Sequence, residues 1–274
     1  MKDKIISLYQ QGAKDFTPED RALFDSFVAG LNQGRIRACE PSDEGWVTNA
    51  WVKQGILIGF RMGKLARMPH SSHKEFYDKD TLPEKRFSLS DQVRVVPGGT
   101  SARTGCYLAP GVTIMPPAYI NIGAWVGSGS LIDSHALVGS CAQIGANVHL
   151  SAGAMIGGVL EPIGSRPVVI EDDAFVGGNT GIYEGVMVSK AAVIASGTIL
   201  TASTPVFDLT QNRFLEMDPH GSYTIPPGAV VVPGSRKSRQ NPDFHIYCPI
   251  IVKYRDAKTD QGLRLEDELR HIFE

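Results

Sequence analysis

A carboxylate stands at one of a series of regularly spaced positions where glycine is otherwise common. In the stretch "GSLIDSHALVGSCAQIGANVHLSAGAMIGG", residues 129–158, Asp133 follows a recurring aliphatic residue, whereas four equivalent positions are Gly127, Gly139, Gly145 and Gly157. Glycine suits a tight turn, so an aspartate in its place presents a carboxylate outside the turn. Such a group can act as a general base, and Asp133 is therefore the first candidate catalytic residue. The alternative is a structural hydrogen bond to a backbone amide of the turn.

The aliphatic residues recur every six positions, without a miss between residues 108 and 156. They are Leu108, Ile114, Ile120, Val126, Ile132, Val138, Ile144, Leu150 and Ile156, and the series resumes at Ile170, Val176, Ile182, Val188, Ile194, Leu200 and Val206. This period fits neither an isolated helix nor an alternating strand. It is typical of a hexapeptide parallel β-helix, in which three short strands form each coil and inward aliphatics stack about every 18 residues.

The repeat divides the chain into three regions. We expect a mainly β protein with an N-terminal helical domain (1–93), a parallel β-helix (94–235) and a C-terminal segment of strand and helix (236–274). The step of fourteen from Ile156 to Ile170 equals two sixes plus two, which predicts a loop inserted at about 158–168 that adds two residues. Residues 207–222 also leave the repeat, over a length that predicts a hairpin or lid.

Capping signals predict a helix before the β-helix, and apolar spacing predicts further helices before and after it. Thr17 is a candidate N-cap, followed by Pro18 at the first helical position, and Gly34 would end this helix. A second helical pattern follows Thr48, and residues 1 to about 85 are predicted to be helical. At the C-terminus one helical face would carry the apolar side chains of Leu265, Leu269 and Ile272.

Composition excludes several classes of protein. The 274 residues carry a formal net charge of -2 without an isolated basic run, so we expect no binding to nucleic acid or membrane surfaces. No apolar run approaches the roughly 20 residues that span a bilayer, and the N-terminus lacks signal-peptide features, which predicts a cytoplasmic protein.

The cysteines are scattered without a CxxC pair, as expected for reduced thiols, and Cys141 is interpreted as a buried small hydrophobe. His135 and His149 are interpreted as structural or surface residues, and no metal site is expected.

Several longer strings resemble one acyltransferase family. "FRMGK", "VRVVPGG", "YINIGAWVGSGSLIDSHALVGSCAQIGANVHLSAGAMIGGVLEP" and "YCPIIVK" together resemble the tetrahydrodipicolinate N-succinyltransferases of the lysine pathway, from about Gly45 to Lys253. The resemblance implies a homotrimer of left-handed β-helices with active sites between subunits. It also implies transfer of a succinyl group from the co-substrate succinyl-CoA to the amine of ring-opened tetrahydrodipicolinate, which yields N-succinyl-2-amino-6-oxopimelate and CoA without a permanently bound cofactor.

The reaction requires a base, because the attacking amine must lose a proton as it adds to the thioester. The resemblance strengthens Asp133 in this role. Family members often carry a glutamate where this chain has Gly181, whereas Glu184 matches a second glutamate of the same segment and is the second catalytic candidate. If the loop adds two residues, Glu184 lies 49 coil positions after Asp133, which is two coils of 18 plus 13. The two carboxylates would then lie on different edges of the prism and could share a site only across a subunit interface.

Arginines are candidates for binding the two carboxylates of the acceptor. The resemblance matches Arg94 to a substrate-binding arginine, and Arg103 follows at the start of the prism. Arg166 in the inserted loop could approach either substrate, but a solvated side chain is the expectation. Small residues near Ala195 and Ser196 would accommodate the pantetheine arm of CoA. Its phosphates would meet Arg236 and Lys237, for which a solvated basic loop is the alternative.

Two other functions fit the repeat. One is acetyl-CoA-dependent acetylation of the same or a related acceptor, since no residue identifies what recognises the free carboxylate of the donor. The other is a non-catalytic β-helical scaffold, because a fold alone implies no reaction. The scaffold would leave Asp133 and the 207–222 excursion without a purpose.

Overall fold

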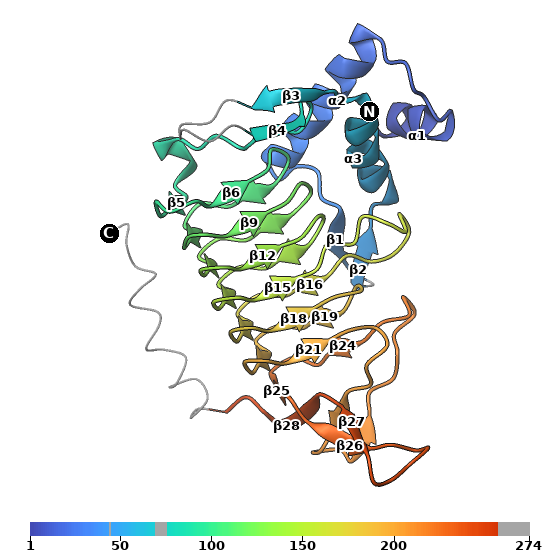
Figure 1. Ribbon diagram of the computed structural model, residues 1–274, viewed down its shortest axis with the longest axis vertical. Coiled ribbons are helices and arrows are strands. Elements are labelled where there is room, and N and C mark those ends of the chain that lie inside the picture. The colour runs from blue at the N-terminus through green and yellow to red at the C-terminus, as the bar shows by residue number, and fades with distance from the viewer. Residues whose placement is uncertain (44, 69–75, 257–274) are drawn as a thin grey trace.

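Three parallel sheets form the faces of a triangular prism in the computed structural model, which describes residues 1–43, 45–68 and 76–256 (Figure 1). The first face contains β5 (Arg94–Val95), β8 (Thr113–Ile114), β11 (Leu131–Ile132), β14 (His149–Leu150), β17 (Phe175–Val176), β20 (Val193–Ile194) and β25 (Ala229–Val232). The second face contains β6 (Ser101–Ala102), β9 (Tyr119–Ile120), β12 (Leu137–Val138), β15 (Met155–Ile156), β18 (Gly181–Ile182) and β21 (Ile199–Leu200). The third contains β7 (Tyr107–Leu108), β10 (Trp125–Val126), β13 (Gln143–Ile144), β16 (Val169–Ile170), β19 (Met187–Val188) and β24 (Thr224–Ile225). The predicted fold class, a left-handed parallel β-helix preceded by helices, is confirmed.

The six-residue repeat sets the register between coils. On the second face Ile120 pairs with Val138, Val138 with Ile156 and Ile156 with Ile182, and all four side chains are fully buried. These aliphatics stack along the axis of the prism and remove their surface from water. Because the inward position of each strand is fixed in this way, the residues after it are fixed at a particular edge of the prism.

The inserted loop is longer than the repeat predicts. Ile170 pairs with Ile144, which lies 26 residues earlier, whereas Ile144 pairs with Val126 at the usual spacing of 18. The loop between β15 and β16 therefore adds eight residues, and the prediction of two was wrong. The step of fourteen from Ile156 to Ile170 consists of six residues of repeat and eight inserted residues. The repeat alone cannot distinguish this division from twelve residues of repeat and two inserted ones.

The described part of the N-terminal region contains the α-helices α1 (Lys2–Gln10), α2 (Pro18–Asn32) and α3 (Ala50–Met62), and a 3-10 helix at Leu89–Asp91. Thr17 caps α2 in a capping box with Asp20, as predicted, and α3 begins just after Thr48. The prediction of helix throughout residues 1–85 was wrong. Two antiparallel pairs interrupt it, β1 (Cys39–Ser42) with β2 (Gly45–Thr48) and β3 (Leu65–Met68) with β4 (Phe76–Lys79).

The helices pack on the edge of the prism between the second and third faces. Phe27 and Ile56 join Ile122 and Cys141 of the coils in one apolar cluster. Cys141 is fully buried, as predicted, and burial raises the pKa of its thiol to about 12. Lys53 of α3 is also fully buried, and its Nζ donates a hydrogen bond of 2.6 Å to the carbonyl of Ser165. Helix α3 thereby holds the inserted loop at the prism.

The chain leaves the coils twice near its C-terminal end. The predicted 207–222 excursion begins with a hairpin of β22 (Phe207–Asp208) and β23 (Arg213–Phe214). A second hairpin joins β26 (Ser235–Lys237) and β27 (His245–Tyr247), after which β28 (Ile250–Tyr254) returns to pair with β25 of the first face (Figure 1). The helix expected to carry Leu265, Leu269 and Ile272 lies outside the described residues.

The stacked core predicts the effect of shortening one inward side chain. Ile156→Ala should lower the free energy of unfolding by about 2–5 kcal/mol, because it removes a fully buried side chain stacked between Val138 and Ile182. Ile199→Ala, at a 37% exposed position of the same face, is the matched control and should cost about 1 kcal/mol or less. Urea unfolding at one protein concentration measures both. Equal losses would contradict the assignment of the core.

Candidate functional site

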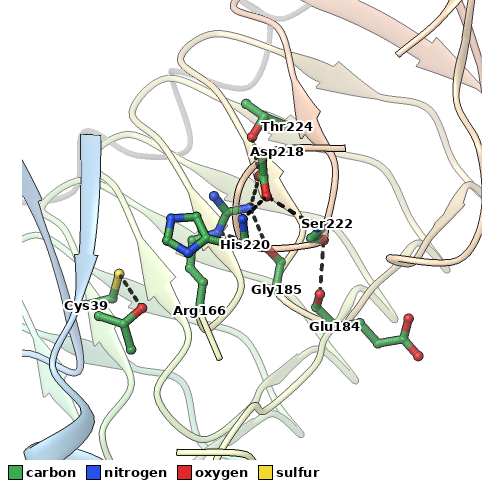
Figure 2. Close-up of polar contacts among 9 residues, drawn as sticks. Cys39, Arg166, Glu184, Gly185, Asp218, His220, Ser222 and Thr224 are labelled. Atoms are coloured by element: carbon green, nitrogen blue, oxygen red, sulfur yellow. Dashed lines mark hydrogen bonds and ion pairs between the residues drawn. The ribbon is translucent and has the colours of Figure 1, made fainter. Parts of the chain in front are cut away.

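A cavity of about 530 Å³ opens where the inserted loop meets the edge between the second and third faces. Its wall is formed by residues 157–166 of the loop, by 183–185 after β18, by Ala202, and by 220–222 of the excursion. Both segments that interrupt the six-residue repeat therefore meet at this cavity. Figure 2 shows the polar side chains at their junction, with Arg166 from the loop and Asp218 from the excursion pointing toward one another.

Arg166 is buried in the wall of this cavity, so the expectation of a solvated side chain was wrong. Its side chain is only 5% exposed. Nε and Nη2 donate to the carbonyl of Gly185 at 3.0 and 2.8 Å, and Nη2 also donates to Oδ2 of Asp218 at 2.6 Å. Gly185 has a φ of 70°, and a Cβ there would lie 2.6 Å from the carbonyl oxygen of Arg166. Glycine thus permits the close approach that fixes the guanidinium.

Asp218 is held as a carboxylate by four donors. Oδ2 accepts from Arg166 and from the Thr224 hydroxyl at 3.0 Å, and Oδ1 accepts from the backbone N–H groups of His220 at 2.9 Å and Ser222 at 3.3 Å (Figure 2). Burial alone would raise the pKa of Asp218, but the hydrogen bond and charge of Arg166, with the bond from Thr224, lower it below its ordinary value. The sequence string "MDPHGS" indicated a turn here, but not the partner of the aspartate.

Glu184 lines the cavity from the corner after β18. It has a φ of 53°, and its side chain is exposed. Oε2 accepts a hydrogen bond of 3.0 Å from the backbone N–H of Ala202, and the Ser222 hydroxyl donates to the Glu184 carbonyl at 3.0 Å. Within the described residues, Oε1 has no hydrogen-bond partner. One oxygen therefore fixes the carboxylate, whereas the other remains available to a molecule in the cavity.

Gly181, which stands where the resemblance leads us to expect a glutamate, faces an aromatic ring. A Cβ at this position would lie 2.5 Å from Cε2 and 2.9 Å from the hydroxyl oxygen of Tyr183. The Tyr183 side chain therefore occupies the space that a side chain of residue 181 would need. A glutamate at position 181 and the ring of Tyr183 would therefore compete for the same space in the cavity wall.

Asp133 lies outside this cavity, at the edge between the first and second faces. It directly follows β11, and its Oδ1 accepts a short hydrogen bond of 2.6 Å from the N–H of Ser134. The corner hydrogen bond considered as the alternative is thus present, but Oδ2 has no partner within the described residues. The half-buried carboxylate keeps one oxygen for other contacts.

The two candidate carboxylates lie on different edges of the prism, as expected. Their 51-residue separation becomes 43 coil positions once the eight inserted residues are removed, which is two coils of 18 plus seven. Glu184 accordingly follows the second face, and the edge obtained from the two-residue insertion was wrong. The cavity and Asp133 are therefore separate features of one copy.

The predicted carboxylate-binding arginines lie near the N-terminal end of the prism. Arg94 is half-buried in β5, and the order β5-β8-β11 places it two strands from the strand that ends beside Asp133. Arg103 instead forms an ion pair with Asp78, and its guanidinium carbon lies 5.8 Å from the centre of the Phe60 ring. The structure brings neither arginine to the cavity of the same copy.

The predicted CoA contacts lie nearer the C-terminal end of the prism. Ala195 and Ser196 follow β20 of the first face, so they occupy the same edge as Asp133, three coils further on, and Ser196 is exposed. Arg236 and Lys237 belong to β26, beside the last coil (Figure 1). This edge therefore carries Asp133 after the third strand of the first face and Ala195 and Ser196 after the sixth.

His135 and His149, interpreted from the sequence as structural or surface residues, do not line the cavity, whereas His220 does. His149 is buried with its ring 4.9 Å from that of Phe175, and His135 is exposed at a corner with a φ of 63°. His220 was missed because the excursion carries no repeat, although it lines the cavity with Glu184 and Arg166. Among the described residues, no group of three or more acidic, histidine or cysteine side chains could hold a metal ion.

Comparisons with known proteins give matches along most of the chain. Residues 1–62 match the family described as tetrahydrodipicolinate N-succinyltransferase N-terminal, and residues 167–202 match the hexapeptide repeat of succinyl-transferase. Three relatives have the name 2,3,4,5-tetrahydropyridine-2,6-dicarboxylate N-succinyltransferase. The relative from Azoarcus sp. (strain BH72) is 46% identical over 89% of this chain and 87% of its own length. That from Bordetella petrii is 44% identical over 93% and 92%, and that from Ralstonia nicotianae 41% identical over 98% and 99%.

The Arg166–Asp218 pair predicts a pH-dependent contribution to stability. Since folding lowers the pKa of Asp218, the pair stabilises the protein above the unfolded aspartate pKa of about 4, and this stabilisation is lost as the pH falls toward the folded pKa. The excess stability of the wild-type protein over the Arg166→Gln/Asp218→Asn double variant should therefore shrink between about pH 6 and pH 3. Urea unfolding at both pH values measures it. A difference that is independent of pH would contradict the ionised pair.

Proposed function

The chain belongs to the 2,3,4,5-tetrahydropyridine-2,6-dicarboxylate N-succinyltransferase family and is a CoA-dependent N-acyltransferase, and we propose that its reaction takes place where the cavity of one copy meets Asp133 of another. It transfers the succinyl group of succinyl-CoA to the amine of ring-opened tetrahydrodipicolinate, the step of lysine and diaminopimelate biosynthesis for which its relatives are named. The observation that carries the proposed location is the separation of Asp133 and Glu184 onto different edges of the prism.

A closed homotrimer would bring these two edges together. In a ring of identical prisms, the edge between the first and second faces of one copy can face the edge between the second and third faces of its neighbour. Each interface then contains one Asp133 and one cavity with Glu184 and Arg166. Arg94, two strands from the strand before Asp133, would enter the same interface, whereas Arg103 is already paired with Asp78.

The carboxylates would perform the proton transfers. The amine nitrogen attacks the carbonyl carbon of the thioester, its proton passes to a carboxylate, and the C–S bond breaks as the tetrahedral intermediate collapses to the amide and CoA thiolate. Asp133 is the proposed base for this step, because its Oδ2 has no partner within the described residues. Glu184, which lines the cavity and whose Oε1 has no hydrogen-bond partner within the described residues, is the proposed second acid–base group for water addition and ring opening.

The donor would extend along the edge that carries Asp133. Exposed backbone near Ala195 and Ser196 can meet the pantetheine arm, and Arg236 and Lys237 supply charge for the phosphates at the end of the prism. A cytoplasmic location accompanies this proposal because succinyl-CoA is an intracellular metabolite. Among the described residues, no helix has the length and apolar character required to cross a membrane.

Release of the CoA thiol tests the reaction and its base together. The purified protein should release CoA rapidly from succinyl-CoA in the presence of tetrahydrodipicolinate, and much more slowly from acetyl-CoA. Asp133→Asn should lower kcat/KM by a factor of about 10²–10⁴ without unfolding the protein, because a general base is lost while the side chain keeps its shape. Asp173→Asn, in a later coil and with a side chain that is 41% exposed, is the matched control and should retain activity.

Two results would overturn this assignment. Turnover with acetyl-CoA in preference to succinyl-CoA would make the protein an acetyltransferase that acts on the same acceptor, the alternative left open by the sequence. Full activity of Asp133→Asn would remove Asp133 from the proton transfer and leave its hydrogen bond to Ser134 as its role.

A further inference from the structure

Arg166 has donor groups that no described residue of the chain uses. A guanidinium carries five N–H groups. The N–H of Nε and those of Nη2 are directed to Gly185 and Asp218, whereas the two N–H groups of Nη1 have no hydrogen-bond partner within the described residues. Because Arg166 is 5% exposed and lines the cavity, acceptors for Nη1 must come from what the cavity contains.

The guanidinium is fixed before any molecule enters. Asp218, which holds it, accepts two further hydrogen bonds from the backbone of the excursion, and Ser165, the residue before Arg166, is held by buried Lys53. Both ends of the arginine are thus attached to neighbouring elements. The two N–H groups of Nη1 point in different directions, so each can donate one charge-assisted hydrogen bond to an anion, and a carboxylate oxygen can accept one of them.

The acidic side chains in the cavity wall favour one class of carboxylate ligand over another. Glu161 and Glu184 also line the cavity, so the clustered phosphates of CoA, which carry more negative charge than a dicarboxylate, would be repelled. A molecule with a carboxylate next to an amine matches these charges, with its carboxylate at Arg166 and its amine at the interface between Glu184 and the partner's Asp133. The ring-opened acceptor of the proposed reaction has such an end, whereas succinyl-CoA has no amine next to its free carboxylate.

We propose that Arg166 is the residue that binds the α-carboxylate of the acyl acceptor, and that the cavity is the acceptor subsite rather than the donor subsite. This inference rests on the proposed function for the identity of the acceptor. The role of Asp218 is to position the guanidinium. Binding of this carboxylate gives a reason for the burial of Arg166, which the sequence predicted to be solvated, where the inserted loop meets the 207–222 excursion.

Steady-state kinetics with both substrates varied tests the assignment. Arg166→Gln should raise the KM for the acceptor by about tenfold or more, with kcat and the KM for succinyl-CoA within about twofold of wild type, because binding is lost equally from ground and transition states. Arg213→Gln, which changes an exposed arginine of the same excursion, is the matched control and should leave all three values unchanged. A rise only in the KM for succinyl-CoA would overturn the proposal.

Calorimetric titration with pimelate tests the subsite without turnover, and so separately from the proposed reaction. Wild-type protein should bind this seven-carbon dicarboxylate about tenfold or more tightly than Arg166→Gln does, and pimelic diamide should bind weakly to both. The Arg166→Gln/Asp218→Asn variant leaves no unpaired buried charge and should show the same loss while remaining folded. Asp218→Asn alone retains Arg166 and should bind pimelate within about threefold of wild type.

Two titration results would overturn the proposal. Wild-type affinity for pimelate in the folded double variant would show that Arg166 binds no carboxylate. A loss in Asp218→Asn as large as that in Arg166→Gln would show that the pair only maintains the structure of the cavity. If pimelate binding depends on Arg166 but the wild-type protein releases no CoA, the subsite stands and the proposed reaction fails.

Discussion

The parallel register between coils is the constraint on which the site depends. Each inward aliphatic pairs with its counterpart one coil away, which is 18 residues where no segment is inserted, and burial of the stack fixes the face on which every strand lies. The residue after an inward aliphatic is then committed to one edge of the prism, and no local rearrangement can move it to another. Asp133 and Glu184 are separated by this rule, so a reaction that uses both needs two copies of the chain.

The chemistry is concentrated where the register is interrupted. The eight residues added between β15 and β16 and the excursion before β24 leave the coils at the same edge, and the buried Arg166–Asp218 pair joins them. Lys53 ties the first of these segments to α3, at the cost of a buried ammonium whose pKa is lowered by its burial. A rigid prism thus carries two irregular segments that are held together by charge, and the cavity lies between them.

Much of this architecture could be predicted from the sequence, because the repeat reports the inward position of each strand directly. Counting residues predicted how the inward aliphatics stack up to Ile156, but not the faces of the strands after the inserted loop, and the capping residues of α2 predicted its start at Pro18. The length of the insertion could not be obtained from the sequence. A step of fourteen is either one repeat plus eight inserted residues or two repeats plus two, and only the pairing of Ile170 with Ile144 decides between these divisions. The burial of Arg166 depends on an aspartate 52 residues later, in a segment without any repeat. The contact of Tyr183 with Gly181 could likewise not be predicted, because it depends on packing in the folded chain and not on the spacing of residues in the sequence.

The claim that one active site is assembled from two copies is tested most directly by mixing two inactive variants. Asp133→Asn removes the base and leaves the cavity open, whereas Ala202→Trp fills the cavity and leaves Asp133 intact. Co-expressed in equal amounts, the two variants should recover about a quarter of wild-type CoA release, because in a closed ring one interface in four combines an intact aspartate with an open cavity. A mixture that stays as inactive as each variant alone would show that Asp133 and the cavity do not meet between copies, and would contradict the account.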